Sequence, residues 1–177
     1  MSSKWLPPDR RAVKVNFDAA FCQHLKQCSS GVVIRNNLGL VMGSGVVLYS
    51  HVADAFAAEA LACLHAITFA RDMGFRKVVV EGDSRTIIVK VQKGVLDRSA
   101  IGVYVKEIRI MALNFDYISF QHADRESNLV AHTIAKMGFK IGNSQCWVEE
   151  VPPDTVAVIE KDRNLKQQPD QARSIIA

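Results

Sequence analysis

The spacing of apolar side chains changes along the chain, and the changes predict which segments are strands and which are helices. Residues 13–18 are apolar at every second position and end in Asp18, as a half-buried strand does. Residues 31–35 and 40–49 also have strand character, and the turn at 36–39 favours a hairpin because asparagine and glycine tolerate positive φ. We therefore expect a three-stranded meander, with an irregular polar segment up to residue 30 between its first two strands.

From residue 52 the apolar positions follow a helical period. Residues 52–73 are rich in alanine and leucine and are followed by Gly74, a common stop after a helix. The later pattern predicts two strands and three further helices. The strands are expected at 78–83 and 115–121, and the helices at 84–93, 99–113 and 124–140. The order β-β-β-α-β-α-α-β-α predicts an α/β fold, with a five-stranded mixed sheet and helices on both faces.

Glu59 is the residue that fits its surroundings least well. Its neighbours one helical turn away are all apolar: Ala55, Phe56, Ala62 and Cys63. A carboxylate on the stripe that faces the sheet costs several kcal/mol if it stays unpaired. A cation, a proton or a metal ion must therefore compensate Glu59.

Two more carboxylates come at the ends of predicted strands. Asp18 ends the first strand and Asp83 ends the strand at 78–83. Ligands of open α/β sheets bind at the carboxyl ends of parallel strands. A helix that faces the sheet can bring Glu59 to the same place, so we expect the three acids to converge.

Length and composition indicate a single domain with short appendages. The chain has 177 residues, of which 49% are hydrophobic, enough for one core. We expect an extended lead-in at 1–12, a domain at 13–142, and a partly disordered tail at 143–177 with some order near Trp147. The four cysteines form no C-x-x-C pair and are expected to be reduced.

The charges are unevenly distributed. Residues 1–142 carry 18 basic and 12 acidic side chains, whereas residues 143–177 carry 4 and 6. A mildly basic body permits a polyanionic partner without requiring one. There is no apolar run long enough for a membrane span and no signal-peptide pattern, so we expect a nuclear or cytoplasmic protein with no membrane contact.

Five motifs in order give the chain a family resemblance. They are Trp5-Leu-Pro-Pro with Lys14-Val-Asn-Phe-Asp18, Gly31-Val-Val-Ile-Arg35, Ala58-Glu59-Ala60, Glu81-Gly-Asp83-Ser84, and His122 followed by Asn128 and Ala131-His132. Together they resemble the plant retrotransposon-type, reverse-transcriptase-like domains of the ribonuclease H superfamily. The resemblance covers residues 5–142.

The resemblance implies a ribonuclease H fold and hydrolysis of the RNA strand of an RNA–DNA hybrid by a monomeric, nucleic-acid-binding enzyme. It implies two Mg²⁺ or Mn²⁺ ions, with Asp18 bridging them and Glu59 and Asp83 each holding one side. Carboxylate oxygens suit these ions, and two such ions neutralise charge on the attacking and leaving oxygens. His122 would assist proton transfer or product release. The substrate contacts expected beside the acids are Ala19, Ala20, Ser84 and Asn128.

His132 departs from the pattern of active relatives, which have a carboxylate at this position of the final helix. Neutral imidazole is a poorer ligand for Mg²⁺ than carboxylate, although it is acceptable for Mn²⁺. His132 is thus either a weak metal ligand or a helix-face histidine beside the pocket. Two hypotheses follow: an active ribonuclease H, or a nucleic-acid-binding domain that has kept the fold and lost turnover. Residues 90–99 include no additional basic helix, which favours weak hybrid binding.

Overall fold

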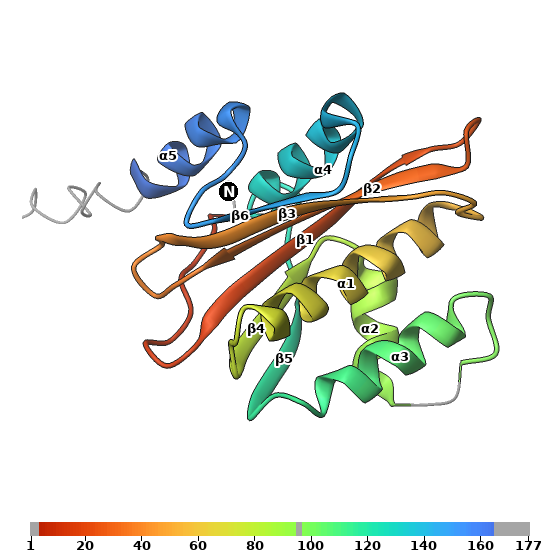
Figure 1. Cartoon of the computed structure of the whole chain (residues 1–177). Helices are drawn as coiled ribbons and strands as arrows, with labels where there is room; N and C mark the ends of the chain where they lie inside the picture. Colours follow the sequence, from red (N-terminus) through yellow and green to blue (C-terminus); the bar gives the residue numbers. More distant parts are fainter. Residues whose placement is uncertain (1–3, 95–96, 165–177) are drawn as a thin grey trace, which may run out of the picture.

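The computed structural model describes residues 4–94 and 97–164, which form one six-stranded sheet with helices on both of its faces (Figure 1). The strands are β1 (Val13–Cys22), β2 (Gln27–Arg35), β3 (Val41–Tyr49), β4 (Lys77–Gly82), β5 (Tyr117–His122) and β6 (Gln145–Val148). The helices are α1 (Ala55–Asp72), α2 (Arg85–Lys93), α3 (Gly102–Ala112), α4 (Leu129–Ile141), the short 3₁₀ helix η1 (Pro153–Thr155) and α5 (Val156–Asn164). Up to the end of α4 the order is the predicted one.

The sheet is mixed, as predicted, and β1 lies in its interior. The strand order is β5-β4-β1-β2-β3-β6; β1, β4 and β5 are parallel to one another, and the remaining neighbours are antiparallel. In the pairing of β1 with β4, Phe17 lies opposite Gly82. The next residue on each strand is an aspartate, so the register alone makes Asp18 and Asp83 neighbours.

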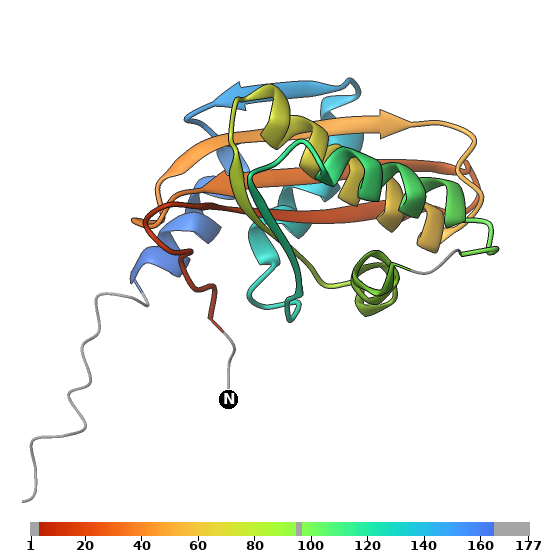
Figure 2. The same ribbon diagram turned by 90° about the horizontal axis from the view of Figure 1, so that it is seen from below.

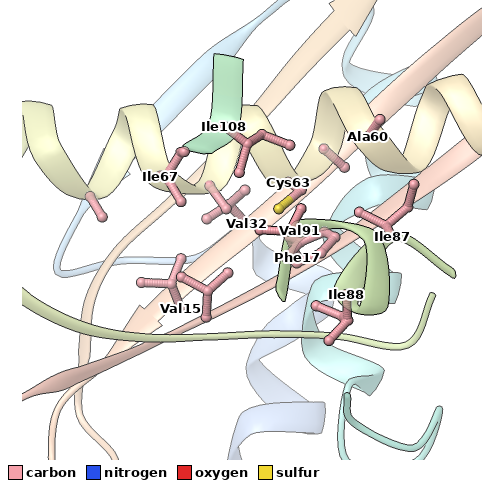
Figure 3. Close-up of a cluster of buried hydrophobic side chains, with 14 of the residues drawn as sticks. Val15, Phe17, Val32, Ala60, Cys63, Ile67, Ile87, Ile88, Val91 and Ile108 are labelled. Carbon is pink, nitrogen blue, oxygen red and sulfur yellow. The ribbon is translucent and has the colours of Figure 1, made fainter. Parts of the chain in front are cut away.

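The helices divide between the two faces (Figures 1 and 2). Helices α1, α2 and α3 cover one face, and α4 and α5 cover the other. The larger core lies under α1, where Val15 and Phe17 of β1 pack against Ala60, Cys63 and other buried side chains (Figure 3). A smaller core under α4 and α5 contains Val33, Val46, Val130, Ile134 and Ile159.

The turn between β2 and β3 forms as its sequence predicts. The Asn36 side-chain oxygen accepts hydrogen bonds from the backbone N–H groups of Leu38 and Leu40, at 2.9 and 3.0 Å. Gly39 has a φ of 78°, a region that glycine enters without the steric cost that a Cβ would add. The hairpin therefore closes through local side-chain chemistry.

The first hairpin is longer than predicted. The segment up to residue 30 was expected to be irregular, but the β1–β2 ladder continues from Asp18 opposite Gly31 to Cys22 opposite Gln27. Serine interrupts the apolar alternation here. Ser30 is nevertheless buried, and a 2.5 Å hydrogen bond between its hydroxyl and His65 of α1 offsets the cost of burying it. A buried polar residue with a partner is compatible with a strand interior.

The sixth strand and the last helix were not predicted. Strand β6 pairs with the edge of β3, with Gln145 opposite Val46, and α5 buries Ile159 in the smaller core. Because β6 has four residues and mostly exposed side chains, its sequence shows no strand period. Residues 165–177, where disorder was predicted, lie outside the described residues, and the proposed domain boundary at residue 142 stays a prediction.

None of the helices within residues 4–94 and 97–164 combines the length and the apolar character that crossing a bilayer requires.

Candidate metal centre

Three carboxylates meet beside the middle of β1 and the carboxyl end of β4. Asp18 was expected to end the first strand, but β1 continues past it to Cys22 because it pairs with β2 over this length. Asp18 and Asp83 come from these adjacent parallel strands, and Glu59 comes from α1, which crosses the sheet beside them. One oxygen from each residue lies within 4.8 Å of the others. The convergence predicted from strand ends and from the misfit of Glu59 is therefore present.

Helix α4 brings His132 to the same cluster. The Nδ1 atom of His132 lies 2.6 Å from the Oδ2 atom of Asp18. This approach depends on Gly31, which pairs with Asp18: a Cβ at residue 31 would lie 2.3 Å from the backbone nitrogen of Ala135. Because the missing side chain lets the α4 backbone touch β2, His132 comes within hydrogen-bonding distance of Asp18.

Two of the three acids, Glu59 and Asp83, have raised pKa values. Burial, followed by the charges of Asp18 and Asp83, raises the pKa of Glu59 to about 9. Burial and the charge of Asp18 also raise the pKa of Asp83, while the nearby Arg125 acts in the opposite direction. Carboxyl groups with raised pKa values are common at functional sites, where a nearby cation favours their charged form.

The residues present fit a hard divalent cation. The Oε2 atom of Glu59 is buried and, within the described part of the chain, makes no hydrogen bond. A buried carboxylate oxygen without a hydrogen-bond partner, beside two further carboxylates, is a donor that a bound cation can satisfy. Oxygen donors of this kind are the ligands that Mg²⁺ and Mn²⁺ prefer.

The acids line a cavity of about 300 Å³. Its walls are made by Asp18, Ala19, Ala55, Phe56, Glu59, Asp83, Ser84, Arg125 and His132. Larger hollows lie elsewhere on the described surface, but they do not contain this cluster of acids. The donor chemistry, rather than the size of the cavity, therefore identifies the candidate site.

The other sequence-predicted residues lie at different distances from the cavity. Ala19 and Ser84 line it, whereas Ala20 is absent from its walls. His122 ends β5 on the exposed surface, and its Nε2 atom lies 3.2 Å from the backbone oxygen of Asp83. His122 is thus beside the cluster and accessible to solvent.

Asn128 lies away from the cavity wall. It has no exposed surface, and its Nδ2 atom donates a 2.9 Å hydrogen bond to the backbone oxygen of Phe17. It also occupies the N-cap position of α4, but its side chain makes no capping hydrogen bond. The side chain of Asn128 points into the protein instead of capping the helix, because its amide is engaged with β1.

Arg125 is the charged wall residue that sequence reasoning missed. Its side chain lines the cavity and lowers the pKa of Asp83 against the effect of burial. The only signal was its place in the loop between His122 and Asn128, where a surface arginine needs no explanation. Its role becomes visible only when the loop is folded beside Asp83.

Comparison with known families decides what kind of domain carries this cluster. The reverse transcriptase-like family matches residues 16–138, more than half of the chain. The chain belongs to the reverse transcriptase-like family. A comparison with curated proteins finds no match for this reverse transcriptase-like chain. A plant or retrotransposon origin stays a prediction.

Solved structures show that the reverse transcriptase-like chain has the ribonuclease H fold, as predicted. RNase H1 of the archaeon Halobacterium salinarum is 22% identical, with a TM-score of 0.68 over 74% of this chain and 99% of that one. The N-terminal RNase H domain of Rv2228c from Mycobacterium tuberculosis is 14% identical, with a TM-score of 0.66 over 73% and 94%. LC11-RNase H1, solved with an RNA/DNA hybrid, is 17% identical, with a TM-score of 0.65 over 73% and 97%.

Proposed function

We propose that this domain is a divalent-metal-dependent ribonuclease that hydrolyses the RNA strand of an RNA–DNA hybrid. The observation that carries the proposal is the convergence of Asp18, Glu59 and Asp83 within 4.8 Å, beside the middle of β1 and the carboxyl end of β4. The ribonuclease H fold supports it, since proteins of that fold include an RNase H1 solved with an RNA/DNA hybrid. The nucleic acid partner is therefore a hybrid duplex.

The acids hold two Mg²⁺ or Mn²⁺ ions in this proposal. Asp18 acts on both Glu59 and Asp83 and would be the ligand that the two ions share, while Glu59 and Asp83 would each hold one ion. When bound, the ions neutralise charge on the attacking and leaving oxygens of the phosphodiester. His132 contributes a neutral nitrogen where a fourth carboxylate would add charge, which favours Mn²⁺ over Mg²⁺.

Side chains around the acids then handle the substrate and its protons. His122 is exposed and close to Asp83, so its imidazole can exchange a proton between the site and water. Arg125 supplies a cation at the cavity wall that can pair with a phosphate oxygen. Ala19 leaves room for the backbone of the substrate, and Ser84 offers a hydroxyl. Ala20 and Asn128 do not line the cavity, and we propose no direct substrate contact for them.

The test of this function is cleavage of a labelled RNA–DNA hybrid by the purified protein. We expect cleavage of the RNA strand in Mn²⁺, slower cleavage in Mg²⁺, and none after chelation, because the carboxylates cannot neutralise a phosphate without cations. Duplex DNA of the same sequence serves as the substrate control. Failure of highly purified protein to cleave the hybrid in either metal would exclude the proposal.

The second candidate is a nucleic-acid-binding domain without turnover. The 2.6 Å contact of His132 with Asp18 favours it, because the imidazole occupies an oxygen that a metal ion needs. This candidate predicts hybrid binding that weakens steeply with salt and is not accompanied by cleavage. The monomeric state and the nuclear or cytoplasmic location stay predictions under both candidates.

Replacing His132 with aspartate separates the two candidates. In an enzyme limited by its fourth ligand, His132→Asp should raise Mg²⁺-dependent cleavage by about 10-fold, because a hard anionic donor replaces a neutral nitrogen. His132→Asn is the matched control, since it removes the imidazole without adding a charge. Cleavage rates at several Mg²⁺ concentrations provide the measurement. Unchanged hybrid binding with no gain in cleavage would favour the binding domain.

A further inference from the structure

A buried polar network lies behind the acids, on the α4 face of the sheet. Lys14, Asn16 and Asp18 alternate along β1 with Val15 and Phe17, which face the larger core. Asn16 has no exposed surface, and its amide group makes three hydrogen bonds. So many bonds from one fully buried side chain fix its orientation.

Three of the bonds in this network run in one direction. The Nε1 atom of Trp5 donates to Oδ1 of Asn16 at 3.0 Å, and Nδ2 of Asn16 donates to Oδ1 of Asn128 at 3.1 Å. Nδ2 of Asn128 then donates to the backbone oxygen of Phe17 at 2.9 Å. These three bonds form a relay that runs from Trp5 through Asn16 and Asn128 to the backbone of Phe17. An indole N–H can only donate and a carbonyl oxygen can only accept, so the two ends of the relay determine which way each amide side chain is turned.

The relay ends at the peptide that carries Asp18. The Phe17 oxygen that accepts from Asn128 belongs to the peptide group whose nitrogen is that of Asp18. Asn128 also begins α4, and its backbone oxygen accepts from the N–H of His132 at 3.1 Å. One side chain therefore holds the backbone of Asp18 and the helical turn that presents His132 to it.

The relay begins outside the segment that matches the family. Trp5 belongs to the lead-in, whereas the family match begins at residue 16 and ends at residue 138. The guanidinium of Arg35 lies 3.9 Å from the centre of the Trp5 ring, and its Nη1 atom is 2.7 Å from Oδ2 of Asp162 in α5. Both flanking segments, the lead-in and α5, thus support the indole that starts the relay.

We propose that Trp5, Asn16 and Asn128 are positioning residues of the metal centre. The two segments that flank the family match, the lead-in and α5, then contribute to the geometry of this centre. The proposal rests on the proposed function insofar as Asp18 holds a metal ion. The relay fixes the peptide of Asp18, so that its carboxylate faces Glu59 and Asp83. Loss of the indole donor leaves Oδ1 of Asn16 without this partner, while Nδ2 keeps its 3.2 Å bond to Oε2 of Glu81. The Asn16 side chain then loses one of the three bonds that fix it, and Asn128 is held less firmly.

The test is a double-mutant cycle with Trp5→Phe and Asn128→Asp. Trp5→Phe keeps an aromatic ring beside Arg35 and removes the indole donor together with part of the buried ring volume. Asn128→Asp keeps the acceptor and removes the donor to Phe17. The matched control is Trp147→Phe, which changes the other tryptophan of the chain on β6, remote in sequence from the relay. All variants are assayed at a temperature where circular dichroism shows them folded.

Each single change should lower kcat and Mg²⁺ affinity by about 10-fold, the usual effect of losing a residue that orients a ligand, and leave the KM for hybrid unchanged. The double variant should also lose about 10-fold rather than about 100-fold, because the bonds act in series. The control should match the wild type. Additive losses, or a lower melting temperature with unchanged kcat and Mg²⁺ affinity, would mean that these residues stabilise the fold but do not position the metal ligands.

The relay can be judged even if the protein does not cleave hybrid. In the ¹⁵N NMR spectrum of the metal-free protein, the Asp18 amide signal should move in Trp5→Phe and Asn128→Asp and stay in place in Trp147→Phe. Titration with Mg²⁺ alone then measures affinity without substrate. Absence of cleavage by the wild type would count against the ribonuclease proposal only, whereas an unmoved Asp18 signal would overturn the relay.

Discussion

Replacing Asp18 with asparagine should lower hybrid cleavage by at least about 1000-fold, because the proposed site shares Asp18 between two metal ions, and such a ligand supports several kcal/mol of transition-state stabilisation. Asparagine keeps the shape of the side chain and the ability to accept a hydrogen bond from His132. The loss of cleavage should therefore reflect only the removal of the negative charge of Asp18. Hybrid binding should change little, since Arg125 would still meet a phosphate in the proposed complex and residues 1–142 carry more basic than acidic side chains.

The same change should make the metal-free protein less sensitive to pH. Because the pKa of Glu59 is about 9 in the folded protein and 4.5 in its unperturbed form, the folded state binds more protons than the unfolded state between these values. Stability therefore falls as the pH rises from 4.5 towards 9. Asp18 is one cause of the shift, after burial, so Asp18→Asn should make this fall shallower.

Urea unfolding from pH 5 to pH 9 in the presence of a chelator measures the effect, with activity assayed on the same preparations. Asp72→Asn is the control, because Asp72 ends α1 in solvent beside Arg71. Added Mg²⁺ should stabilise the wild type most at high pH, where the acids are ready to bind it. Full cleavage by Asp18→Asn, or an unchanged pH slope, would contradict the assigned position of Asp18 in the site.

Replacing Asp162 with alanine should destabilise the protein by about 3 kcal/mol, because it removes the charge that compensates a buried guanidinium. Arg35 is 1% exposed, and the described part of the chain offers no hydrogen-bond partner to its Nε and Nη2 atoms. Burial lowers the pKa of Arg35, and Asp162 acts against that effect. The ring of Trp5 offers only partial compensation once the carboxylate is gone.

A surface ion pair of the same type supplies the control. Arg76 and Asp116 are 3.0 Å apart, but both side chains are more than half exposed, so Asp116→Ala should cost less than about 1 kcal/mol. Equilibrium unfolding in urea compares the two variants with the wild type. Equal small losses would mean that α5 is attached to the domain mainly by the apolar packing of Ile159.

The acids of the site were predictable from sequence because each carries a local sign of its role. Asp83 directly follows the apolar strand β4, and Asp18 follows the apolar alternation of residues 13–17, which pairs in parallel with β4 up to Gly82. Glu59 interrupts an apolar stripe, which is costly without a partner. These signs depend on neighbours along the chain and need no knowledge of tertiary contacts.

The remaining parts of the site depend on contacts between segments far apart in sequence. Asn16 and Asn128 are separated by 112 positions, and the residues next to each of them do not predict the hydrogen bond that joins the two. Strand β6 has too few residues to show a period, and it becomes a strand because the edge of β3 offers unpaired backbone groups. The residue pattern of one segment does not show which hydrogen-bond partners a distant segment will bring to it.

The contact of α4 with Gly31 limits how this site can be altered by mutation or design. The helix backbone already touches the strand, and any side chain at residue 31 would push the whole helix outward. Packed backbones do not yield by fractions of an ångström to suit a new ligand. The spacing between β1 and α4 is thus a constant of the fold, and the metal preference of the site has to be tuned through the chemical identity of the side chain at position 132.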